Sequence, residues 1–124
     1  MTRIYVASPY SHPDPAVVDA RVDQTERYVA HLWRERGQHP FSPICHWHRV
    51  CRSHALPGHA AAWAQYNRRE LALSEVLHVL AIDGWRESVG VAMEIRWARG
   101  MGMFAAMAVP TVRGYELRRL EGVS

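Results

Sequence analysis

A sequence pattern typical of a short buried strand, followed by a tight turn and a helix, limits this chain to few folds. Residues 76–82 (VLHVLAI) are rich in aliphatic and β-branched side chains and almost wholly apolar. Such a run is typical of a strand that is covered on both faces in a parallel sheet. Asp83 and Gly84 follow it directly and predict the turn that ends the strand.

The segment after this turn is predicted to be a helix with an acidic side chain on its apolar face. Val91, Ile95 and Ala98 recur at helical spacing, and Glu94 falls on the same stripe. Helical side chains lean toward the N-terminus, so Glu94 is expected to lie over the bare backbone of Gly90. A glycine this early in a helix leaves room for a ligand to approach, and this arrangement predicts a pocket beside the carboxylate.

Ser88 stands where the N-cap of the same helix is expected. The free N–H groups and the positive end of the helix dipole would favour a phosphate or another electron-rich group there. Ser88 is therefore a candidate for a ligand contact as well as for a cap.

The rest of the chain alternates between strand and helix patterns. Further strands are predicted over residues 4–7, 41–44 and 104–109, and helices over a long segment that ends near residue 36 and over residues 60–73. Residues 45–59 look irregular, and the segment from residue 111 is expected to add a short strand or helix. Strands alternating with helices predict a three-layer α/β sandwich with a mostly parallel sheet of four or five strands.

The topology also predicts where a ligand would bind. In parallel α/β sheets, ligands occupy the crevice beyond the carboxyl ends of the strands. The loops at residues 8–14 and 83–88 both leave that edge, so these two distant segments should meet there.

Size and composition narrow the classes of function. The chain has 124 residues and is read as a single domain spanning residues 1–124. All fifteen basic residues are arginines, so Schiff-base chemistry and a phosphate-binding P-loop lysine are excluded. The arginines are scattered, which does not suggest nucleic-acid binding.

No apolar run approaches the roughly 20 residues that span a bilayer, so a cytoplasmic protein without membrane contact is expected.

Two sequence patterns together resemble the nucleoside 2-deoxyribosyltransferase-like family, in particular its small bacterial members. They are IYVASPY at residues 4–10 and GWxxSxGxxxExxxA at residues 84–98. The resemblance implies a flavodoxin-like or Rossmann-like fold and cleavage or transfer at the N-glycosidic bond of a nucleoside or nucleoside monophosphate. It also implies a homo-oligomer, and a reaction that requires no cofactor.

The resemblance assigns roles to individual residues. Glu94 matches the family's nucleophile, whose carboxylate attacks the anomeric carbon of the sugar and forms a covalent glycosyl-enzyme that water or a second base resolves. By the same matching, Tyr5 would orient this carboxylate and Asp83 would hold a sugar hydroxyl or the base. Ser88 and Gly90 would contact the sugar or a 5′-phosphate. The other substrate-binding candidates are Ser8, Pro9, Tyr10 and Trp85.

Each of these residues also has a purely structural interpretation. Glu94 could pair with a nearby arginine, and Tyr5 could be an ordinary core residue. Ser88 could be a cap alone, Asp83 a turn residue and Trp85 a packing anchor.

A histidine-rich segment leaves a different chemistry open. His46, His48 and Cys51 are candidate ligands for zinc or another transition metal, and His54 and His59 lie close by in the sequence. Two other functions therefore remain as alternatives: a nucleotide-binding module that does not catalyse, and a metal-assisted hydrolase that uses this segment.

Overall fold

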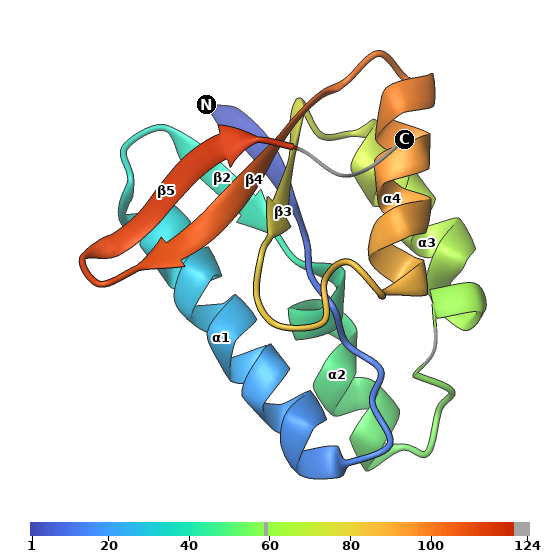
Figure 1. Cartoon of the computed structure of the whole chain (residues 1–124). Helices are drawn as coiled ribbons and strands as arrows, with labels where there is room; N and C mark the ends of the chain where they lie inside the picture. The colour runs from blue at the N-terminus through green and yellow to red at the C-terminus, as the bar shows by residue number, and fades with distance from the viewer. Residues whose placement is uncertain (59, 121–124) are drawn as a thin grey trace.

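A five-stranded sheet separates two helical layers in the computed structural model, which describes residues 1–58 and 60–120 (Figure 1). The strands are β1 (Thr2–Ala7), β2 (Gln38–Phe41), β3 (Val76–Leu80), β4 (Phe104–Thr111) and β5 (Gly114–Arg119). The helices are α1 (Pro15–Arg34), α2 (Pro43–Ser53), α3 (Ala60–Ala72) and α4 (Val89–Gly100). The predicted three-layer α/β sandwich with a mostly parallel sheet is therefore confirmed.

The strand order places two neighbouring loops at the carboxyl edge of the sheet. The order is β2-β1-β3-β4-β5, with β1 parallel to β2 and β3, and β3 parallel to β4. β5 pairs antiparallel with β4 as a hairpin, so the segment after residue 111 adds a strand. Because β1 and β3 are adjacent and parallel, the loops that follow them leave the sheet side by side.

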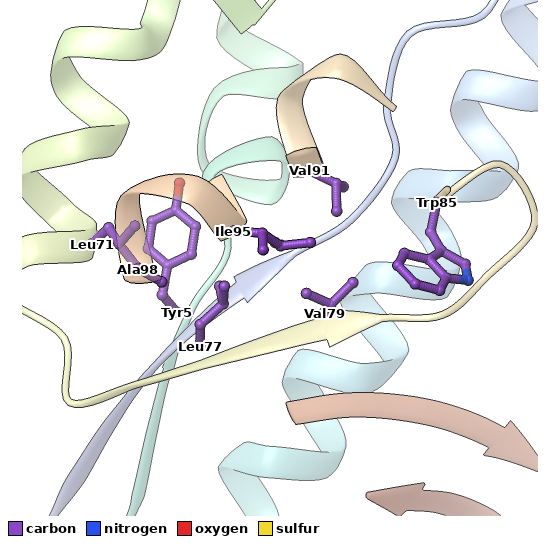
Figure 2. Close-up of a cluster of buried hydrophobic side chains, with 9 residues drawn as sticks. Tyr5, Leu71, Leu77, Val79, Trp85, Val91, Ile95 and Ala98 are labelled. Carbon is purple, nitrogen blue, oxygen red and sulfur yellow. The ribbon is translucent and has the colours of Figure 1, made fainter. Parts of the chain in front are cut away.

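One face of the sheet packs against α3 and α4. Tyr5, Leu77 and Val79 point to this face and meet Val91 and Ile95 of α4 (Figure 2). All five side chains are almost completely buried. The strand side chains that alternate toward this face and the α4 side chains that recur at helical spacing therefore pack in one shared core.

The opposite face packs against α1. Ile4 and Val6 lie in a second buried cluster with Tyr28 and Leu32 of that helix. His78 of β3 is also buried on this side, where its Nδ1 lies 2.7 Å from the Tyr28 hydroxyl.

Two expectations for the middle of the chain are wrong. Residues 41–44 were predicted to be a strand, but β2 ends at Phe41 and α2 begins at Pro43. Residues 45–59 were predicted to be irregular, yet α2 extends to Ser53. The reason is local: the Ser42 hydroxyl caps the helix by accepting from the backbone N–H of Cys45 at 3.2 Å, and Pro43 occupies the first helical turn, where a missing N–H does no harm.

None of the helices in the described part of the chain has the length and apolar character needed to cross a membrane.

Candidate active site

Glu94 lies in the interior of the protein beside the first strand. Its helix begins after Ser88, whose hydroxyl accepts from the backbone N–H of Val91 at 3.2 Å, as the predicted cap would. Only 5% of the Glu94 surface is exposed. The Tyr5 hydroxyl donates a hydrogen bond to Glu94 Oε2, which orients the carboxyl group.

The buried environment shifts the ionisation of both groups. Burial raises the pKa of Glu94 from 4.5 to about 8, and the hydrogen bond from Tyr5 opposes this shift. Burial also raises the pKa of Tyr5 well above its usual range, and the nearby Glu94 carboxylate adds to this effect. Within residues 1–58 and 60–120, no arginine forms an ion pair with Glu94, so the structure gives no support to a salt-bridge role.

Glu94 borders a cavity of about 750 Å³ at the carboxyl edge of the sheet. The sequence-predicted residues that line this cavity are Ser8, Tyr10, Asp83, Ser88, Gly90 and Glu94. They come from the loop after β1, the loop after β3 and the first two turns of α4. The two distant segments that were expected to meet at this edge therefore do so.

Three of the predicted residues lie outside the cavity wall. Tyr5 is fully buried and reaches the site only through its hydrogen bond to Glu94. Pro9 is fully buried. Trp85 belongs to the core on the α4 side of the sheet, and Figure 2 shows it on the loop after β3, at the opposite end of the cluster from Tyr5. The packing interpretation of Trp85 therefore agrees with the structure better than a ligand contact.

The far wall of the cavity comes from α2 and α3, which sequence reasoning did not place there. Trp47 and Trp63 line it, and their rings stack with centroids 4.1 Å apart and planes 21° apart. Ile44 of α2 and Met93 of α4 add apolar surface to the cavity. The signal that could have found this wall is the Ser42-Pro43 pair, which marks the start of a helix carrying Trp47.

A cationic side chain lies on the wall near the turn after β3. Arg21 of α1 lines the cavity and donates from Nη1 to the backbone carbonyl of Ser11 at 2.9 Å. Gly84 has a φ of +92°, and a Cβ at this position would overlap the Arg21 guanidinium. The positive φ favours glycine here, and an added Cβ would also displace the end of the Arg21 side chain. The acidic side chains Asp83 and Glu87 share this part of the lining.

The histidine-rich segment does not form a metal site in the part of the chain that is described. His48 and Cys51 line the cavity from α2, whereas His46 packs against the ring of Trp47. No group of three or more His, Cys, Asp or Glu side chains is arranged to hold a metal ion among residues 1–58 and 60–120. His59 lies outside the described residues.

The whole site falls within a recognised sequence family. A family model described as a domain of unknown function, DUF1937, matches residues 2–109. The chain belongs to the DUF1937 family. The match runs from β1 into β4 and includes every cavity residue named above. A comparison with curated proteins gave no match.

Proposed function

We propose that this DUF1937 protein cleaves or transfers the N-glycosidic bond of a nucleoside or nucleoside monophosphate, with Glu94 as the nucleophile. The observation that carries the proposal is a buried carboxyl group that opens onto a sizeable cavity and is oriented by the Tyr5 hydroxyl. The resemblance of residues 4–10 and 84–98 to nucleoside 2-deoxyribosyltransferase-like proteins supports the same conclusion.

The chemistry follows from the position of the carboxylate. As the bond from the anomeric carbon to the base breaks, positive charge develops on the sugar. A Glu94 carboxylate in a dry environment would stabilise this charge and then bond to the anomeric carbon. Water or a second base would release the sugar from this glycosyl-enzyme. The reaction requires no metal or organic cofactor.

The remaining cavity residues fit the parts of such a substrate. The aromatic wall of Trp47 and Trp63 offers apolar surface to a planar base. Asp83 could accept from a sugar hydroxyl. Arg21 and the N-terminus of α4 at Ser88 would attract a 5′-phosphate.

A nucleotide-binding module without catalysis is the second candidate, because the same cavity could serve recognition alone. The two are separated by measuring both binding and base release on the same nucleosides and nucleoside monophosphates. Tight binding by calorimetry without any base release, even with acceptor bases present, would favour the binding module. The metal-assisted hydrolase lacks support because the described residues hold no metal-binding group.

The decisive experiment measures base release chromatographically for wild type, Glu94→Gln and Glu116→Gln. Glu94→Gln keeps the shape of the side chain and should lose at least about 10³-fold in kcat, since a nucleophile has no substitute. Glu116 is exposed on β5 and its variant should behave as wild type. Undiminished turnover by Glu94→Gln would refute the role of this residue.

We also propose a homo-oligomer, as the family resemblance implies, and a cytoplasmic location. Light scattering on the eluting protein would test the oligomeric state, and a monomer at working concentration would refute it.

A further inference from the structure

Tyr10, His48 and Asp19 form a chain of polar contacts that begins at the cavity. The Tyr10 hydroxyl lies 2.7 Å from His48 Nδ1, and both residues line the cavity. On the other side of the imidazole ring, Nε2 lies 3.6 Å from Asp19 Oδ1. The three side chains come from the loop after β1, from α2 and from α1, so the tertiary fold alone brings them together.

The charges around His48 favour one arrangement of its protons. The Asp19 carboxylate beside Nε2 favours a proton on that nitrogen, which leaves the Nδ1 lone pair to accept from the Tyr10 hydroxyl. Arg52, one turn after His48 on α2, pairs with Asp19 and holds it in place. Glu26 of α1 is a more distant acidic neighbour. With its own proton engaged by His48, Tyr10 is left with oxygen lone pairs to accept a proton from a ligand.

We propose that Tyr10 and His48 form a proton relay that activates the acceptor, water or a second base, in the step that releases the sugar from Glu94. This inference rests on the function proposed above and extends it to the second half of the reaction. Tyr10 would be the catalytic residue that contacts the acceptor. His48 would be the positioning residue that takes the proton from Tyr10.

The step balances without any further reactant. When water attacks, a bond forms between its oxygen and the anomeric carbon, and the bond from that carbon to Glu94 breaks. The electron pair of the broken bond returns to Glu94 as carboxylate. One proton of the water passes to the Tyr10 oxygen while the Tyr10 proton passes to His48 Nδ1. The resulting imidazolium is stabilised by Asp19 and gives its proton to solvent before the next turnover.

The ionisation of the two groups agrees with this direction of proton flow. Burial lowers the pKa of His48 and Arg52 adds to this, while Asp19 and Glu26 act against it, so the ring is neutral near pH 7 and able to accept a proton. Burial raises the pKa of Tyr10, and the nearby Cys51 thiol acts in the same direction. Tyr10 therefore needs a base beside it in order to remove a proton from another group.

The test compares Tyr10→Phe and His48→Gln with two matched controls in the full-length protein. The controls are Tyr66→Phe, an exposed tyrosine of α3 outside the cavity lining, and His54→Gln, an exposed histidine that follows the last turn of α2. Nucleoside substrates would be mixed rapidly with each protein, with base release followed in time and the intact protein mass measured. Azide would then be added, because this anion attacks the anomeric carbon without having to lose a proton.

Loss of the relay should slow the second step and leave the first. Tyr10→Phe should release one equivalent of base in a burst, accumulate protein heavier by one sugar, and turn over at least about 10²-fold more slowly. His48→Gln should show the same burst with a smaller loss, since the Tyr10 hydroxyl remains. Azide should restore turnover in both variants and yield the glycosyl azide, whereas Glu94→Gln should not respond. Both controls should match wild type.

Two results would overturn the inference, and they are distinguishable. The relay alone is refuted if wild type releases base and Tyr10→Phe turns over normally. It is also refuted if wild type releases base and Tyr10→Phe is slow but shows neither a burst nor rescue by azide. Absence of base release by wild type from every nucleoside and nucleoside monophosphate would refute the proposed function and the relay with it.

Discussion

Replacing Glu94 by glutamine is expected to make the protein progressively more stable than wild type as the pH rises. The buried carboxyl group has a pKa of about 8 in the folded protein and an ordinary value of 4.5 when the chain unfolds. Folding therefore favours the protonated form of Glu94. The stability that this group contributes is fully present below pH 4.5 and is lost as the pH rises to about 8. Glutamine has no proton to lose, and it can still accept from Tyr5.

The magnitude follows from the two pKa values of Glu94. Each pKa unit corresponds to about 1.4 kcal/mol, so the complete effect is about 5 kcal/mol, most of which falls between pH 5 and pH 8. This is a large fraction of the roughly 5–15 kcal/mol that stabilises a typical domain. Comparing the variant with wild type at each pH cancels the contribution of every other titrating group, including His78.

Urea unfolding at pH 5, 6, 7 and 8, followed by far-UV circular dichroism, measures the difference directly. The Glu116→Gln control should differ from wild type by a constant amount over this range, because this side chain is exposed on β5. A difference between Glu94→Gln and wild type that stays within about 0.5 kcal/mol from pH 5 to pH 8 would mean that the carboxylate is solvated in the folded protein. Such a result would contradict a Glu94 nucleophile in a dry environment.

Three further outcomes are expected. If ionised Glu94 is the nucleophile, kcat/KM should rise about tenfold per pH unit below pH 8 and level off above it; a flat profile from pH 5 to pH 9 would contradict this. Burial lowers the pKa of His78 from 6.5 to about 4, so the contribution of His78 to stability should fall by about 3 kcal/mol as the pH drops from 6.5 to 4. Urea unfolding should show wild type losing about this much stability relative to His78→Gln over the range, because the opposite titration of Glu94 cancels in the difference; a difference that stays constant would contradict the burial of His78. Gly84→Ala and Gly37→Ala should each destabilise the fold by about 1 kcal/mol, because both glycines have positive φ. Only Gly84→Ala should also weaken nucleotide binding measured by calorimetry, because the added Cβ displaces Arg21, whereas Gly37 has open space around it. Equal nucleotide affinities of the two variants would argue against a ligand role for Arg21.

Much of the fold could be read from local patterns. The strand at residues 76–80, the cap at Ser88 and the apolar stripe of α4 depend on neighbours within one or two turns of the chain, so their sequence signals are strong. The same patterns predicted that Glu94 lies on the buried face of its helix. They also predicted that the loops at residues 8–14 and 83–88 lie at the carboxyl edge of the sheet.

The errors arose where one residue has two possible local meanings. Proline weakens a strand, but Pro43 is favourable in the first turn of a helix after a serine cap. Because residues 41–44 are predicted as a strand, neither α2 nor the cavity wall that carries Trp47 and His48 is expected from the sequence.

Local sequence patterns are enough to predict the alternation of strands and helices, the edge of the sheet where a ligand is expected and the acidic residue beside it. The enclosure of this edge by α2 and α3, the packing of Trp85 in the core and the contact between Tyr10 and His48, 38 positions apart in the sequence, emerge only when the chain is folded. Helical and strand periodicity depends on short-range spacing. A cavity, its dryness and the ionisation of the groups inside it depend on contacts between segments that no local pattern records.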